Sequence, residues 1–139
     1  MSDNPSIISY TTNLADQEAV APLPASDYVG TIEKAENKKS EKGNGYLALT
    51  VNIPAEQFPA DYDAQGQDDG VNLVFRGLST EDAARPRYRM RMFLESVGMV
   101  PSNEIDINDL IGRTVNVTVG HSTYEGETRA EIKRIVGQG

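Results

Sequence analysis

The stretch "ENKKSEKGNGYLALTVNI", residues 36–53, decides the fold of this chain. Its second half alternates strictly between apolar side chains and smaller or polar ones, which is typical of a β-strand with one buried face. The apolar set is Leu47, Leu49, Val51 and Ile53. Directly before this strand, "GNG" supplies residues that tolerate the positive φ of a tight turn. The stretch therefore predicts the second strand of a β-hairpin, with Tyr46 on the outward face and lysines in the turn.

Working outward from this hairpin, the sequence predicts four more strands and one helix. The first strand is "DYVGTIEKAE" (27–36), where Gly30 indicates a bulge or bend. The others are "VNLVFRGL" (71–78), "RTVNVTVG" (113–120) and "TRAEIKRIV" (128–136), with "HSTYEGE" (121–127) as the last loop. A helix is expected over residues 86–97, with Pro86 in its first turn and Gly98 as its stop.

This order of elements predicts a mainly β fold: a five-stranded antiparallel barrel with one helix between strands three and four. That is the arrangement of the oligonucleotide/oligosaccharide-binding (OB) fold. Other α+β folds built from an antiparallel meander and one helix share the same order. An irregular N-terminal arm precedes the barrel, so the expected organisation is an acidic arm over 1–27 and an OB-like domain over 28–139.

The formal net charge of −8 on 139 residues is strongly segregated along the chain. Residues 1–27 carry four acidic residues and no Lys or Arg, and the long loop at 54–70 carries five acidic residues and no basic one. The remainder is close to neutral, so a positive groove can exist on an acidic protein. The absence of cysteine excludes disulfides and favours a reducing compartment, the cytoplasm.

The sequence gives little support for an enzyme or for a metal-binding protein. The single histidine, His121, has no nucleophile in a strained turn beside it, so we expect no enzyme. "DYDAQG" (61–66) has the spacing of the start of a calcium loop, but Asn72 stands where the bidentate glutamate is required. We therefore expect no metal and no cofactor.

The basic and aromatic residues carry the functional hypothesis. A protein that binds single-stranded nucleic acid needs cations along the phosphates and aromatic faces for stacking. The lysines of the first hairpin loop, outward residues of strands two and three, and residues of the last hairpin meet both needs. The basic residues are Lys38, Lys39, Lys42, Arg76, Arg113, Arg129, Lys133 and Arg134, and the aromatic ones are Tyr46 and Tyr124. The alternative is that the lysines only solubilise a hairpin turn, a common feature of exposed strands.

The helix carries a second basic cluster, "RPRYRMR", with Arg85, Arg87, Arg89 and Arg91. It fits either a phosphate-contacting or partner-docking surface, or the solvated face of a helix whose arginines pair with Glu95, Glu81 or Asp82.

The hairpin "DYVGTIEKAENKKSEKGNGYLALTVNI", followed by "RMFLESVGM", "DLIGRTVNVTVG" and "YEGETRAEIKRI", resembles phage-encoded single-stranded DNA-binding proteins of OB fold. The resemblance covers roughly residues 26–136. By match of position it implies that DNA contacts seven residues: Lys38, Lys39, Lys42, Tyr46, Arg76, Tyr124 and Arg129. It implies a non-catalytic replication or recombination accessory that coats single-stranded DNA without sequence preference, in the host cell cytoplasm. It departs from better-known single-strand binders because the C-terminus, "KRIVGQG", is not acidic. The acidic arm and loop are then candidates for recruiting replication or recombination proteins. The alternative is a phage structural or protein-interaction module that docks onto a partner through the same segments. No membrane contact is expected.

Overall fold

Five antiparallel strands form one sheet in the hydrogen-bonded order β3-β2-β1-β4-β5. The computed structural model describes residues 6–11, 13–16, 21–62 and 69–138. The strands are β1 (Ser26–Lys39), β2 (Gly45–Ile53), β3 (Val71–Ser79), β4 (Thr114–Tyr124) and β5 (Glu127–Gly137), and the helix is α1 (Ala84–Ser96). Short 3-10 turns are η1 (Leu14–Asp16), η2 (Ala55–Gln57) and η3 (Ile107–Leu110). The expected mainly β fold with five antiparallel strands and one helix is confirmed.

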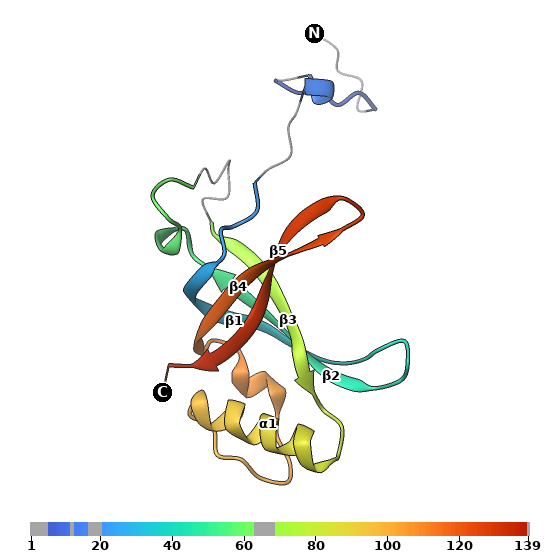
Figure 1. Ribbon diagram of the computed structural model, residues 1–139, viewed down its shortest axis with the longest axis vertical. Coiled ribbons are helices and arrows are strands. Elements are labelled where there is room, and N and C mark those ends of the chain that lie inside the picture. The colour runs from blue at the N-terminus through green and yellow to red at the C-terminus, as the bar shows by residue number, and fades with distance from the viewer. Residues whose placement is uncertain (1–5, 12, 17–20, 63–68, 139) are drawn as a thin grey trace.

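The sheet is strongly curved, and α1 lies at one end of it (Figure 1). The long strand β1 pairs with β4 along its first half and with β2 along its second half. This brings the edge strands β3 and β5 close to one another, but no ladder of hydrogen bonds joins them. The sheet is therefore open. The helix follows β3 and is separated from β4 by a loop and η3.

The core forms because each strand sends alternate apolar side chains to the inside of the curve. Leu47, Leu49, Val51 and Ile53 of β2 are fully buried, as their alternation predicts. Val115, Val117 and Val119 do the same on β4. Burial of such side chains, at roughly 1.5–3 kcal/mol each, is the main stabilising contribution. Phe93, Leu94 and Val97 close the core from α1, as the helical spacing predicts.

Gly30 is required for close approach of two strands. A Cβ at this position would lie 2.5 Å from Val51 Cγ1 and 2.8 Å from the carbonyl oxygen of Asn52. The irregularity in the β1–β2 ladder instead falls between Ile32 and Lys34, at Glu33. The expectation of a bulge at Gly30 is therefore wrong in position. Glycine is needed there because β2 leaves no room for a side chain.

The helix ends as the sequence predicts, and its end is fastened by an arginine. Pro86 lies in the first turn, and Gly98 adopts a left-handed conformation (φ +84°) after the last turn. The guanidinium of Arg113 donates to the carbonyl oxygens of Val97 and Asp109, both at 2.8 Å. Arg113 thereby satisfies carbonyl groups that the helix end and η3 leave unpaired.

The base of the N-terminal arm is part of the folded body. Leu23 is 2% exposed and belongs to the core. Three side chains fasten the backbone around it: Tyr62 Oη donates to Ala21 O (2.9 Å), Tyr28 Oη to Pro24 O (2.7 Å), and His121 Nε2 lies 2.8 Å from Leu23 O. Burial raises the pKa of the Tyr28 hydroxyl, which keeps it a donor. The irregular arm is therefore shorter than the expected 1–27, because the segment from Ala21 onward is held against the body and β1 begins at Ser26.

The acidic loop at 54–70 meets the arm at this point. Within it, Phe58 and Tyr62 form an edge-to-face ring pair with centroids 5.4 Å apart. Residues 63–68 lie outside the described residues, and with them most of the "DYDAQG" spacing. In the described part of the chain no three His, Cys, Asp or Glu residues gather as metal ligands. No helix among the described residues is long and apolar enough to cross a bilayer.

Candidate nucleic-acid interface

The strand register places a set of polar and basic residues on the outer face of β1, β2 and β3. Residues directly paired across neighbouring strands share a face of the sheet. Lys38 pairs with Tyr46, which in turn pairs with Ser79. Lys34 pairs with Thr50, which pairs with Val74. Since the neighbours of Tyr46 and Thr50 along β2 are the buried leucines and valine, these rows point away from the core.

Lys38 and Lys39 lie on β1 and not in the hairpin loop, so their expected position is wrong. The strand runs to Lys39, three residues beyond the expected end at Glu36, and the turn is confined to residues 40–44. Only Lys42 belongs to the turn. Because strand residues alternate between faces, Lys38 lies beside Tyr46 while Lys39 points to the opposite face.

Lys34 is a further candidate residue that the sequence did not indicate. It lies four positions before Lys38 on β1, so both side chains share the outer face. In the sequence, Lys34, Glu36 and Lys38 occur at every second position, as residues on one face of a strand do. The expected strand ended at Glu36, so Lys38 was not placed on the same face as Lys34. The bulge at Glu33 also shifts the alternation that is expected from the start of the strand.

One carboxylate lies among these lysines. Glu36 Oε1 is 3.2 Å from Lys34 Nζ, and its Oε2 is 3.8 Å from Lys38 Nζ. All three side chains are substantially exposed, so each ion pair contributes no more than about 1 kcal/mol. A phosphate can replace such a weak partner at little cost. Lys39, Lys42 and Arg76 make no ion pair or hydrogen bond with the described residues through their side chains.

Arg76 lies on the irregular part of β3. Phe75 pairs with Leu49, and Leu78 with Leu47, so Arg76 and Gly77 together face the single residue Ala48. This is a β-bulge, which bends the edge strand. Arg76 is exposed, and strand alternation after the inward Phe75 directs it to the outer face. The structure therefore places Lys38, Tyr46 and Arg76 on one face. Tyr46 and Arg76 were predicted to face outward on their strands, whereas Lys38 joins them from β1 and not from the loop.

The last hairpin differs from the expected loop at 121–127. The β4–β5 ladder continues to the pair Tyr124–Glu127, and only Glu125 and Gly126 form the turn. Both have positive φ, 51° and 80°, as a two-residue hairpin turn requires. Tyr124 is therefore the last strand residue and is 66% exposed. Arg129 pairs with Ser122 across the ladder, and its Nη2 lies 3.0 Å from Glu127 Oε2.

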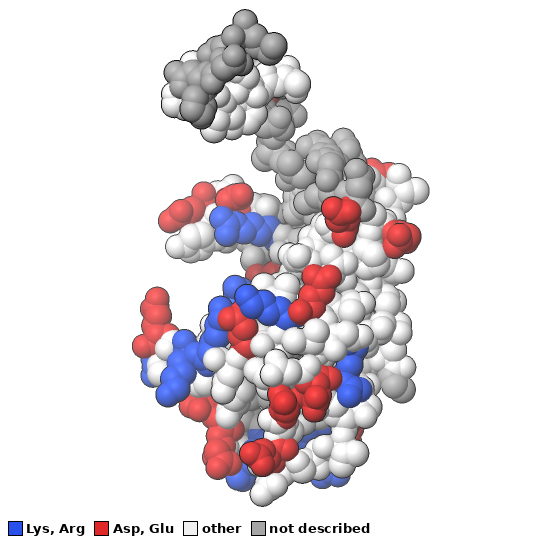
Figure 2. Space-filling view, turned by 180° about the vertical axis from the view of Figure 1, so that it is seen from behind, with Lys and Arg blue, Asp and Glu red and all other residues white. Residues whose placement is uncertain are grey.

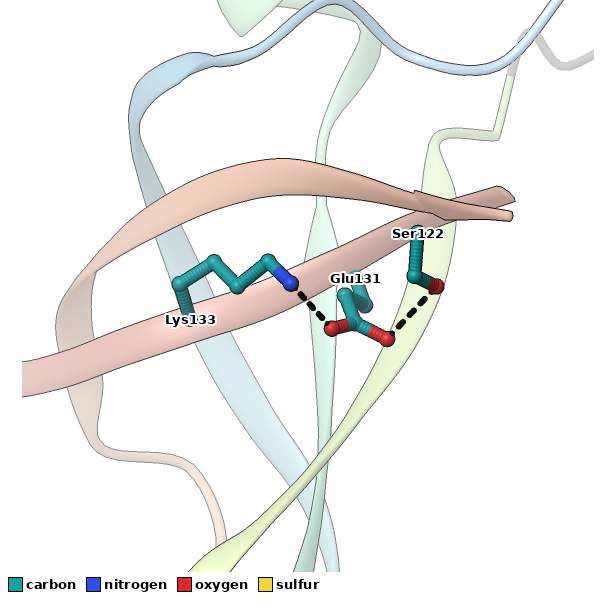
Figure 3. A network of polar contacts seen from close by, with 3 residues as sticks. All are labelled: Ser122, Glu131 and Lys133. Atoms are coloured by element: carbon teal, nitrogen blue, oxygen red, sulfur yellow. Dashed lines mark hydrogen bonds and ion pairs between the residues drawn. The ribbon is translucent and has the colours of Figure 1, made fainter. Parts of the chain in front are cut away.

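A polar network stiffens the same hairpin (Figure 3). Ser122 Oγ donates to Glu131 Oε2 at 2.9 Å, and Lys133 Nζ donates to Glu131 Oε1. The hydrogen bonds from Lys133 and Ser122 lower the pKa of the Glu131 carboxyl. The carboxylate neutralises Lys133, so this lysine is less available to an anionic ligand than Lys34 or Lys42.

The β1–β2 and β4–β5 hairpins project from the same side of the molecule (Figure 1). In the space-filling view the surface between them is hollowed (Figure 2). Lys and Arg side chains gather on this side, with Asp and Glu among them (Figure 2). The seven predicted residues thus fall into two groups. Lys38, Tyr46, Arg76 and the flanking Lys39 and Lys42 belong to the first hairpin and its sheet, and Tyr124 and Arg129 belong to the second hairpin.

Two cavities lie elsewhere on the surface. One of about 390 Å³ covers the outer face of β1, β4 and β5, between Asp27, Asn116 and Arg134. The other, of about 570 Å³, runs beside α1 between Met90 and Ile105. None of the seven predicted residues lines either cavity.

His121 has a structural contact. It lies on β4 and not in a loop, and its Nε2 must carry the proton because the Leu23 carbonyl can only accept.

Comparison of the chain with models of known protein families and with curated proteins finds no match.

Proposed function

We propose that this protein is a non-catalytic, sequence-independent single-stranded DNA-binding protein that acts as a replication or recombination accessory of a phage. The observation that carries the proposal is the row Lys38–Tyr46–Ser79, which sets an aromatic ring beside a lysine on an outward sheet face near the turn of the β1–β2 hairpin.

The strand order supports an OB-like reading of the sheet. In an OB fold, a partly open five-stranded barrel binds oligonucleotides on the face of strands two and three, flanked by the loops after strands one and four. Here the outer face of β2 and β3 carries Tyr46 and Arg76, and the two flanking hairpins are those that project together. The close approach of β3 and β5 fits the partly open barrel.

The chemistry of binding follows from these groups. Lys34, Lys38 and Arg76 would contact successive phosphates, and each phosphate neutralised would release a counterion. Tyr46 would stack on a base, which requires no particular base because every base has a π-face. Lys42 and Arg129 on the hairpins would hold the strand at the two sides. Phosphate contacts and stacking do not depend on the identity of the base, so little sequence preference is expected.

Fluorescence anisotropy of a labelled single-stranded oligonucleotide, beside a duplex of the same sequence, tests the proposal. The expected result is salt-sensitive binding to the single strand and much weaker binding to the duplex. The variant Lys38→Ala/Arg76→Ala should bind more weakly, and Arg134→Ala, on the outer face of β5, should bind as the unaltered protein does. Absence of single-strand binding at low salt would rule the proposal out.

A further inference from the structure

The exposed apolar side chains of this protein are concentrated in two places. Nine large hydrophobic residues among the described residues are exposed; four of them are Ile7, Ile8, Tyr10 and Leu14 on the N-terminal arm, and two more are Tyr88 and Met92 on α1. Ile8 is 74% exposed and Tyr88 60%. Single exposed hydrophobic residues are ordinary, but clusters of them mark interaction sites.

The two on the helix belong to a stripe with two unpaired arginines. Arg85, Tyr88, Arg89 and Met92 are spaced three and four residues apart, so they share one face of α1. This face, here called the α1 stripe, lies away from Phe93 and Leu94, which enter the core. Arg87 and Arg91 lie outside the stripe and are neutralised by Asp82 and Glu95, each at 2.9 Å. Arg85 and Arg89 have no ion pair with any described residue.

The arm has the complementary character. Residues 1–20 include three carboxylates and no Lys or Arg, and Asp16 lies two residues after the exposed Leu14. An acidic, apolar segment and a basic, apolar helix face therefore occur on the same chain. Both surfaces are exposed in the single molecule, both are apolar, and their charges are opposite.

The two surfaces are attached to opposite ends of the sheet. The hydrogen bonds to Ala21, Leu23 and Pro24 fix the base of the arm at the end occupied by Tyr62 and the β4–β5 strands, while α1 lies at the other end (Figure 1). In a single molecule the arm therefore extends away from the end of the sheet where α1 lies, as a segment that contacts a neighbouring molecule would (Figure 1).

We propose that the arm of one copy docks on the α1 stripe of a second copy. Ile7, Ile8, Tyr10 and Leu14 pack on Tyr88 and Met92, and the carboxylate of Asp16 pairs with Arg85 or Arg89. The contact joins two different surfaces, so it repeats from copy to copy. If the proposed function is also correct, neighbouring molecules on one strand would touch, and binding would be cooperative.

Sedimentation velocity of the full-length protein without DNA, over a range of concentrations at low salt, provides the test. The unaltered protein should gain mean mass as its concentration rises, and added salt should reduce the gain. Two full-length variants should each stay monomeric: the arm variant Ile8→Asp/Leu14→Asp and the stripe variant Arg85→Glu/Arg89→Glu. All the altered positions are exposed, so both variants should keep the circular-dichroism spectrum of the folded protein. Arg134→Glu, a charge reversal outside the stripe, should associate like the unaltered protein.

Mixing the two variants distinguishes docking from a general effect of charge. The stripe variant retains an intact arm and the arm variant retains an intact stripe, so the mixture should form a one-to-one dimer that neither forms alone. A mixture that stays monomeric would overturn the proposal, as would an unaltered protein that does not associate. The proposal would also be wrong if the stripe variant associated normally but lost affinity for single-stranded DNA, since α1 would then be a nucleic-acid surface. Because no DNA is present in the association test, its outcome is independent of the proposed function.

Discussion

Lys38 on β1 and Tyr46 on β2 are direct partners across the antiparallel ladder. Directly opposed side chains have their Cβ atoms about 4.5–5.5 Å apart. A cation and an aromatic ring are therefore held side by side on the outer face by backbone hydrogen bonds, and no loop conformation is needed to bring them together. This pair offers one group for a phosphate and one for a base, and it is the centre of the proposed interface.

Tyr46→Ala should weaken single-stranded DNA binding by about 1–3 kcal/mol, roughly 5- to 150-fold in Kd, because one base loses its stacking surface. Tyr46→Phe keeps the ring and should bind nearly as well as the unaltered protein. Anisotropy titrations at one salt concentration compare the three proteins. Equal affinity of a folded Tyr46→Ala variant would remove this residue from the interface.

Lys38→Ala should reduce the salt dependence of binding by about one counterion in a plot of log K against log salt concentration. Lys34→Ala should act similarly, since Lys34 shares the same face. Lys133→Ala is the matched control: this lysine is also paired with a carboxylate, but it lies on β5 and not on β1, β2 or β3, so the slope should change less. A larger change for Lys133 than for Lys38 would move the phosphate path to the β4–β5 hairpin.

Glu131→Gln should destabilise the protein slightly at neutral pH and not at low pH. The folded-state pKa of Glu131 is depressed by Lys133 and Ser122. Its stabilising contribution is therefore present above the ordinary carboxyl pKa and is lost as the pH falls through the lower, folded-state pKa. The groups are exposed, so the difference should be at most about 1 kcal/mol. Thermal unfolding at pH 7 and near pH 3 measures it; a difference that grows in acid would contradict the network's role.

Leu23→Ala should cost about 2–5 kcal/mol of unfolding free energy, because this side chain is buried in the core. Leu14→Ala, at a position 62% exposed on the same arm, should change stability by no more than about 0.5 kcal/mol. Chemical denaturation of both variants measures the contrast. If the two variants proved equally stable, the base of the arm would not belong to the folded body.

Gly30→Ala should destabilise by about 1–3 kcal/mol or more, since the added Cβ meets Val51 and the backbone of Asn52. Gly43→Asn is the comparison. Gly43 has φ +83° in open space, and asparagine tolerates that conformation, so little change is expected. Similar melting temperatures for Gly30→Ala and the unaltered protein would show that β1 and β2 can separate without cost.

The sequence by itself determined the elements whose signals are local. The alternation of Leu47 to Ile53 specifies a strand with one buried face, and Pro86 and Gly98 bound the helix, because backbone sterics and side-chain periodicity act over a few residues. The lengths of the strands were harder to predict from the sequence. Lys38, Lys39 and Tyr124 are polar or exposed, yet they lie on strands because their backbone groups are paired by a neighbouring strand, a stabilisation that no local pattern records.

Only the tertiary structure decided which residues lie together. The pairing of Lys38 with Tyr46 depends on the register of two strands, and the addition of Lys34 depends on a bulge at Glu33. The attachment of the arm to the acidic loop depends on a hydrogen bond between Tyr62 and Ala21, 41 positions apart. Contacts of this kind arise when curvature brings distant segments to one end of a sheet. They are set by how the whole core packs, which is a property of all the strands at once and of no single segment.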